Sequence, residues 1–164
     1  MYMHTRARVA LLHTGLSAKL GVMAEIERLV EADAESLSDI NSLIHQLSLR
    51  LTECSMDLFK KILGDQNHEL WVVRDGKKIV GMATLAIVII PEGERAQIED
   101  VVVDETYRGQ GLGEQLSKKL IERARARNIP KITLSSRADR AAANSLYQKL
   151  GFTQWPTNVY HMKL

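Results

Sequence analysis

The sequence predicts a single domain of the α/β (α+β) class, with helices flanking a mixed, mostly antiparallel central sheet. Two turn signals, Asp75-Gly76 and Pro91 to Glu94, separate apolar runs and indicate an antiparallel meander. Further along, a glycine-dense turn joins an apolar run to a helical pattern and then to another apolar run, which indicates a strand–helix–strand crossover. With 164 residues, 45% of them apolar, the chain is long enough to bury a core.

The first elements are predicted to be a strand and two helices. Apolar and polar residues roughly alternate from Val22 to Leu29, as in a half-buried strand. An amphipathic helix follows, with Asp33 or Ser36 as its cap. Its apolar positions, at steps of three and four, are Leu37, Ile40, Ile44 and Leu47. A second helix is predicted from Met56 to Leu63, where Gly64 ends it.

The predicted meander has strands from Leu70 to Val73, from Ile79 to Ala83 and from Ala96 to Val103. A long helix follows the glycine turn. Its apolar face consists of Leu112, Leu116, Leu120 and Ala124. Its charged face, which we expect to be solvated, carries Lys118, Lys119, Glu122, Arg123 and Arg125.

The last part of the chain is predicted to hold two short strands around one helix. Pro130 ends the long helix, and Ile132 to Leu134 is the strand that completes the crossover. A helix from Ala141 to Leu150 ends at Gly151, and a final strand is predicted from Val159 to Met162.

Composition excludes several classes of function. A formal charge of +2 and 5% aromatic residues argue against partners such as nucleic acid or a membrane surface. The longest uncharged run, from Ile79 to Ile90, is too short to span a bilayer. The five histidines show no ligand spacing, so we predict no metal site. Cys54 is the only cysteine, which excludes an internal disulfide and favours a cytoplasmic setting.

Residues 1–21 contain three basic residues and no acid. We interpret them as an N-terminal extension that need not be ordered, in front of one domain spanning residues 22–164. A targeting peptide is the less favoured alternative, because the apolar middle of this segment is weak and interrupted.

The glycine-dense turn, Arg108-Gly109-Gln110-Gly111-Leu112-Gly113, predicts an anion site. Backbone N–H groups at a helix N-terminus point at one spot beside the positive end of the helix dipole, and Arg108 adds a cation. A dinucleotide fingerprint would need glycine where Glu114 stands, and a nucleotide P-loop would need lysine after Gly113. We therefore expect the turn to bind a pyrophosphate, but as neither a dinucleotide fingerprint nor a nucleotide P-loop.

A second motif lies downstream, beyond one predicted strand: Ala142-Ala143-Asn144-Ser145-Leu146-Tyr147-Gln148-Lys149-Leu150-Gly151-Phe152. Together the two motifs resemble those of the GNAT superfamily of acetyl-CoA-dependent N-acetyltransferases, most strongly from about Ile98 to Phe152. The resemblance implies an acetyltransferase-like fold with acetyl-CoA as the acyl-donor cosubstrate. It also implies direct transfer of the acetyl group to a primary amine in a ternary complex.

The resemblance further implies a set of cofactor-binding residues. Backbone groups of Val101 and Val103 would pair with pantetheine, and Asn144 would hydrogen-bond the same arm. The coenzyme A pyrophosphate would be held by Arg108, Gly109, Gln110, Gly111 and Gly113. Many relatives have asparagine seven residues before the tyrosine, where this chain has Arg140, a residue that could add a cation for a phosphate of the coenzyme.

By the same resemblance, Tyr147 is the predicted general acid, which protonates the leaving thiolate. Glu99 and Asp100 are the candidates for the base, because they are adjacent carboxylates inside an otherwise apolar strand. Strand alternation sends them to opposite faces, with Glu99 on the face of Val101 and Val103 unless a bulge intervenes. We favour Glu99.

Several alternatives stay open. Tyr147 could be a core aromatic, and the chain could be a non-catalytic acyl-CoA sensor or, less favoured, a nucleic-acid-binding protein. The acceptor could be a small amine, an aminosugar, a polyamine or a peptide N-terminus. Ser135, Ser136 and Arg137 follow a strand where relatives build part of the acceptor pocket, although loop polarity alone would explain them. Association into a homodimer is an expectation from the resemblance only.

Overall fold

Five strands form one sheet in the order β1-β2-β3-β4-β5, in a computed structural model that describes residues 24–47 and 52–163. All neighbouring strands are antiparallel except β4 and β5, which are parallel. The predicted mixed, mostly antiparallel sheet with one crossover is therefore confirmed. The elements are β1 (Ala24–Arg28), α1 (Ala34–Leu47), α2 (Met56–Gly64), β2 (His68–Asp75), β3 (Lys78–Ile90), β4 (Gly93–Val103), a 3-10 turn (Glu105–Tyr107), α3 (Leu112–Ala126), β5 (Ile132–Leu134) and α4 (Ala141–Lys149). The predicted extension of residues 1–21 lies outside the described residues.

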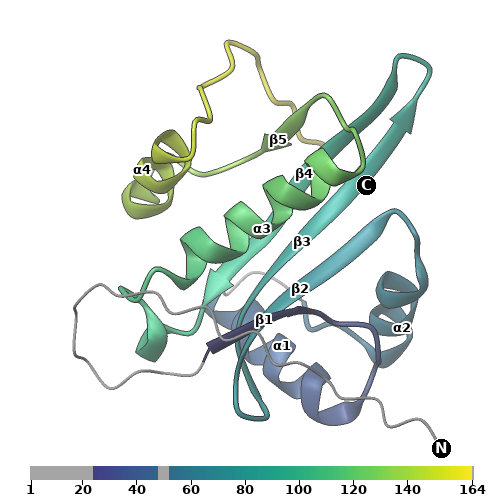
Figure 1. Cartoon of the computed structure of the whole chain (residues 1–164), viewed down its shortest axis with the longest axis vertical. Helices are drawn as coiled ribbons and strands as arrows, with labels where there is room; N and C mark the ends of the chain where they lie inside the picture. The colour runs from purple at the N-terminus through teal and green to yellow at the C-terminus, as the bar shows by residue number, and fades with distance from the viewer. Residues whose placement is uncertain (1–23, 48–51, 164) are drawn as a thin grey trace, which may run out of the picture.

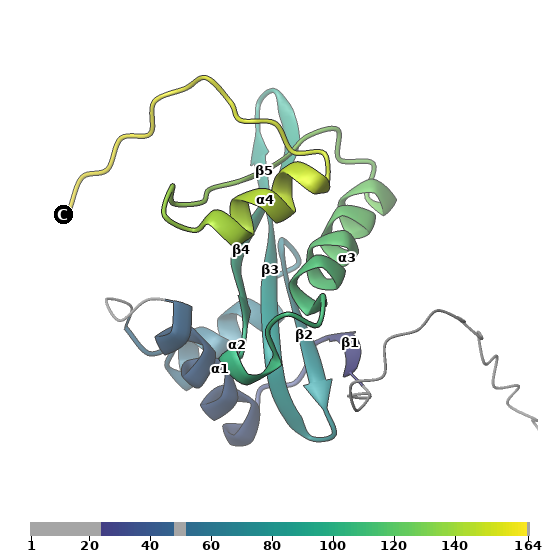
Figure 2. The same cartoon turned by 90° about the vertical axis from the view of Figure 1, so that its left-hand side faces the viewer.

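Helices cover both faces of the sheet, and each face has its own apolar core. Helix α3 lies on one face, and helices α1 and α2 lie on the other (Figures 1 and 2). On the α3 face the predicted apolar positions of the helix are all buried, together with strand residues such as Leu85 and Ile98. On the opposite face Phe59, Leu43 and Val72 are buried. Two layers of helix around one sheet thus account for the apolar content of the chain.

Side-chain caps define where α1 and α2 begin. The Asp33 carboxylate accepts a hydrogen bond of 2.8 Å from the Ser36 N–H group and one of 2.7 Å from the Ser36 hydroxyl. Asp33, rather than Ser36, is therefore the cap of α1. Helix α2 is capped by Ser55, whose hydroxyl accepts from the Leu58 N–H group at 3.2 Å.

A bulge in β4 decides which way its side chains point. The pairing between β3 and β4 slips by one residue, because Met82 is opposite Val102 whereas Thr84 is opposite Glu99. Asp100, in the bulge, has a φ of 54°. Ile98 before the bulge and Val101 after it both pack on the α3 side, so Glu99 lies on the opposite face. The alternation without a bulge, which put Glu99 on the face of Val101 and Val103, is therefore wrong for this strand.

The predicted final strand, from Val159 to Met162, is also wrong. None of the described residues after α4 belongs to a strand. Val159 and Tyr160 are 88% and 87% exposed. A four-residue apolar run becomes a strand only when another strand pairs with it, and sequence alone does not supply that partner.

The expectation of a solvated charged face on α3 is wrong for Arg123. Its guanidinium donates two hydrogen bonds, of 2.9 and 2.8 Å, to the carboxylate of Glu69 on β2. Glu69 is only 1% exposed and also accepts from the Trp71 indole at 3.0 Å. The Nη1 atom of Arg127 lies 3.7 Å from the same carboxylate. Arg125, by contrast, is exposed as predicted.

Candidate functional site

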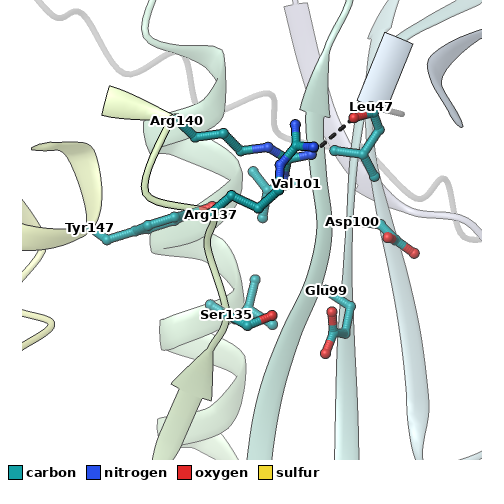
Figure 3. Close-up of a pocket in the computed structure, with 9 residues that line it drawn as sticks. Leu47, Glu99, Asp100, Val101, Ser135, Arg137, Arg140 and Tyr147 are labelled. Carbon is teal, nitrogen blue, oxygen red and sulfur yellow. Dashed lines mark hydrogen bonds between the residues drawn. The ribbon is translucent and has the colours of Figure 1, made fainter. Parts of the chain in front are cut away.

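A cavity of about 230 Å³ opens where β4 and β5 separate. The two strands pair only from Ala96 to Ile98 on β4, whereas β4 continues to Val103. The walls come from the end of α1, the open part of β4, the segment between β5 and α4, and α4 itself (Figure 3). The lining residues are Leu47, Ile98, Glu99, Asp100, Val101, Ser135, Arg137, Arg140 and Tyr147.

Beyond Ile98, β4 has backbone groups that β5 does not pair with. The Asp104 N–H group donates to the Val80 carbonyl on β3 at 2.9 Å. Because backbone groups alternate in direction along a strand, those of Val103 and Val101 point away from β3, toward the edge that β5 leaves open. The Val103 carbonyl there accepts a hydrogen bond of 3.1 Å from Nε of Arg108. An extended ligand can pair with this edge as an added strand would.

The glycine turn lies at the end of β4 and leads directly into α3. Gly109 and Gly111 have φ values of 78° and 77°, which residues with a side chain rarely adopt. Helix α3 begins after Gly111 without a side-chain cap, so its first N–H groups are available to an anion. A Cβ atom on Gly113 would lie 3.8 Å from Leu146 and 3.9 Å from Val103, so the turn sits against both α4 and β4. Arg108 and Gln110 are exposed at its surface.

Tyr147 reaches the cavity from α4. Its ring packs edge-on against Phe152, with the ring centroids 6.0 Å apart. Burial raises the pKa of its hydroxyl above the usual value, while the positive charge of Arg140 acts in the opposite direction. A phenol with a raised pKa keeps its proton at neutral and mildly alkaline pH, as a proton donor must.

The two carboxylates stand on the β4 wall, across the cavity from Tyr147 in Figure 3. Burial raises the pKa of Asp100, and the nearby charge of Arg140 partly offsets this effect. Glu99 accepts a hydrogen bond from the side-chain amide of Gln97. The cavity therefore holds two groups able to accept a proton and one able to donate it.

Arg140 connects two walls of the cavity. Its Nη2 atom donates to the Leu47 carbonyl at 2.9 Å, which ties the segment before α4 to the end of α1 (Figure 3). The departure from the asparagine of many relatives marked this position in the sequence, but not its partner, because the two residues are 93 positions apart. Asn144 lies outside the cavity lining, and its side-chain amide donates to the Arg137 carbonyl at 2.9 Å.

Cys54 belongs to the core between α1, α2 and the sheet, and it does not line the cavity. Burial raises the pKa of its thiol. Within residues 24–47 and 52–163, no three His, Cys, Asp or Glu side chains come close enough together to hold a metal ion. In the same residues, no helix has the length and apolar character needed to cross a membrane.

The architecture and the two motifs agree with a comparison against known families. The model of the acetyltransferase (GNAT) family matches residues 35–152, which include the glycine turn, the cavity and α4. The chain belongs to the GNAT family of acetyltransferases, and its relatives are named as N-acetyltransferases. The family expected from the two sequence motifs is thereby confirmed.

Individual relatives resemble parts of the chain. The [ribosomal protein bS18]-alanine N-acetyltransferase of Escherichia coli K12 is 34% identical over 91 residues, 56% of this chain and 58% of that protein. The glucosamine 6-phosphate N-acetyltransferase of Trypanosoma brucei brucei is 44% identical over 78 residues, 46% of this chain and 51% of that protein. The crystal structure of a Trypanosoma brucei acetyltransferase matches with a TM-score of 0.67 and 28% identity, covering 86% of this chain and 98% of that one. The chain thus spans about half the length of the curated relatives it matches.

Proposed function

We propose that the protein transfers the acetyl group of acetyl-CoA directly to a primary amine in a ternary complex. One observation carries the proposal: a single cavity brings Tyr147 of α4 together with Glu99 and Asp100 at the open edge of β4, the strand that leads into the glycine turn. The family uses acetyl-CoA, and the two curated relatives described above are named for N-acetyl transfer, one to an alanine and one to an aminosugar phosphate. The proposed acceptor class is therefore an amine, either a small molecule or a peptide N-terminus.

The cofactor would follow the open edge of β4. Pantetheine would pair with the backbone of Val101 and Val103, whose polar groups face that edge. The pyrophosphate would bind the turn through Arg108, Gly109, Gln110, Gly111 and Gly113. Asn144 remains a proposed partner of the pantetheine arm, because its bond to the Arg137 carbonyl uses only one of its two amide N–H groups.

In the proposed reaction, the amine nitrogen attacks the thioester carbonyl, so a C–N bond forms and the C–S bond breaks. The amine loses one proton to a carboxylate, directly or through water, and the departing sulfur takes one from the Tyr147 hydroxyl. We favour Glu99 as the base because it lies on the α1 face of β4, opposite the face where α3 and the cofactor turn lie. Asp100 is the second candidate, since its raised pKa suits a base near neutral pH.

Direct transfer is favoured over an acyl-enzyme route. Cys54 is the only cysteine, and it is buried in the core between α1, α2 and the sheet. Its raised pKa disfavours the reactive thiolate. No acyl intermediate on this thiol is therefore expected.

The proposal is tested with the full chain, acetyl-CoA and a panel of primary amines. Free coenzyme A thiol should appear only when an amine is present, and the amine should gain the mass of one acetyl group. Tight binding of acetyl-CoA without turnover of any amine would instead support the non-catalytic sensor.

Replacement of Gly111 by alanine should weaken acetyl-CoA binding. At a φ of 77° a residue with a Cβ atom is strained, so alanine should shift the turn and with it the first N–H groups of α3 that would bind the anion. We expect the Kd to rise about tenfold, as for the loss of one charge-assisted hydrogen bond. Calorimetric titration with acetyl-CoA measures the change.

Gly76→Ala is the matched control, because Gly76 also has a positive φ, of 60°, and open space around it, but lies in the β2–β3 hairpin. Both variants should lose similar stability, and only Gly111→Ala should lose affinity. Equal Kd values for the two variants would show that this turn does not bind the pyrophosphate.

A further inference from the structure

The cavity contains two positive and two negative side chains that do not pair with one another. Arg137 and Arg140 come from the segment between β5 and α4, and Glu99 and Asp100 come from β4. Among these four described residues, no ion pair of 4.0 Å or less joins an arginine to a carboxylate. The pKa of Asp100 stays raised despite Arg140, which agrees with charges held apart across the cavity. Unpaired opposite charges around a cavity favour a ligand that carries both signs.

The two arginines lie on the acceptor side of the sheet. Arg140 donates to the carbonyl of Leu47 at the end of α1, and α1 packs on the face opposite α3. The glycine turn belongs to the start of α3, so the guanidinium of Arg140 does not share the proposed pyrophosphate site. In Figure 3 both arginine side chains extend toward Leu47. This geometry argues against a role for Arg140 at the proposed pyrophosphate site.

Both guanidinium groups keep donors for a ligand. Within the described part of the chain, Arg140 donates one hydrogen bond to a neutral carbonyl, which leaves most of its five donors for a ligand. Arg137 has its Nε atom 3.4 Å from a carboxylate oxygen of Asp139, and both side chains are more than 60% exposed. An exposed pair of this kind contributes little and exchanges easily for a better anion. Planar guanidinium groups match carboxylates and phosphates especially well.

We propose that the acceptor is an amine that also carries an anionic group, a carboxylate or a phosphate. The anionic group binds Arg137 and Arg140, and the amine then faces Glu99 and Asp100 across the cavity. This inference rests on the proposed acetyl transfer and narrows its acceptor. A polyamine, which has only positive charge, would bring its cations against both arginines and is disfavoured.

The test uses matched pairs of amines that differ by one anionic group. L-alanine against L-alaninamide tests the carboxylate, glucosamine 6-phosphate against glucosamine tests the phosphate, and spermidine is the purely cationic amine. In at least one pair, the anionic member should have a kcat/KM about tenfold or more above that of its neutral partner. The pair that shows the preference identifies the anionic group.

Arg137→Gln should then raise KM for the preferred acceptor about tenfold, with KM for its neutral partner and for acetyl-CoA unchanged. Arg140→Gln should do the same, and Arg140→Lys, which keeps the charge, should restore part of the loss. Arg125→Gln, on the exposed side of α3, is the control and should change neither value. Thermal melting checks that each variant is folded.

Two results would overturn this inference without overturning the proposed acetyl transfer. Acetylation of neutral amines or spermidine as efficient as that of the anionic members, or an equal loss on both members in Arg137→Gln, would exclude the anion site while leaving acetyl transfer intact. Binding of acetyl-CoA without acetylation of any amine would remove the proposed function, and this inference with it.

Discussion

Replacing Tyr147 by phenylalanine is expected to lower kcat about 100-fold and to leave KM for acetyl-CoA within about twofold. The change removes one oxygen atom and keeps the ring that packs against Phe152, so the fold of α4 is preserved. General acid catalysis usually contributes more than this when the leaving group is strongly basic. Here the leaving group is a thiolate, with a pKa near 8.5 for an ordinary thiol, so we expect a value at the low end.

The thiol-release assay under saturating amine measures both parameters. Tyr160→Phe is the matched control, because Tyr160 is 87% exposed and does not line the cavity. Because burial raises the pKa of Tyr147, the wild-type enzyme should keep its activity to a pH above the usual tyrosine value. An unchanged kcat in Tyr147→Phe would assign the residue to packing and remove it from the chemistry.

Replacing Glu69 by glutamine is expected to lower the free energy of unfolding by about 3 kcal/mol. The carboxylate is almost fully buried and accepts two hydrogen bonds from Arg123 and one from Trp71. A neutral amide cannot accept both guanidinium bonds. The Arg123 guanidinium would then keep its charge without a carboxylate partner, which is costly. Chemical denaturation at neutral pH measures the loss. Glu122→Gln is the control, since Glu122 is 66% exposed and lies 4.0 Å from Lys119.

The same carboxylate makes stability depend on pH in a defined direction. Hydrogen bonds from Arg123 hold the pKa of Glu69 at about 2, below its ordinary value of 4.5. Its contribution is therefore fully present above pH 4.5 and is lost as the pH falls from 4.5 toward 2. Wild-type stability should fall over this range more steeply than that of Glu69→Gln. Parallel pH profiles for the two proteins would show that Glu69 is not the source of the acid sensitivity.

Local signals predicted the order of the elements from β1 to α4 and the position of the glycine turn. The hairpin around Gly76 needs a positive φ, and the dipeptide Asp75-Gly76 announces it. The apolar face of α3 repeats at steps of three and four, and its residues are buried as expected. These features depend on residues close together in the chain, so periodicity and turn chemistry are sufficient to predict them.

Features that depend on distant residues were not predicted. The bulge at Asp100 arises from the register between β3 and β4, and it moves Glu99 to the other face of the sheet. Arg140 and Leu47 come together only when α4 is placed over the open end of the sheet. In the sequence Arg123 looks like another surface cation, because no local pattern indicates that it pairs with Glu69 on β2. In each case the deciding contact joins elements that only the folded chain brings together.

The most direct test of acetyl transfer within this one cavity is a two-substrate kinetic experiment with the full chain. Initial rates of thiol release are measured over a matrix of acetyl-CoA and acceptor concentrations, and the intact mass of the protein is followed with acetyl-CoA alone. Transfer in a ternary complex predicts double-reciprocal lines that intersect and a protein mass that stays unchanged. Parallel lines together with a protein that gains an acetyl group would contradict the account, because they would require an acyl-enzyme intermediate.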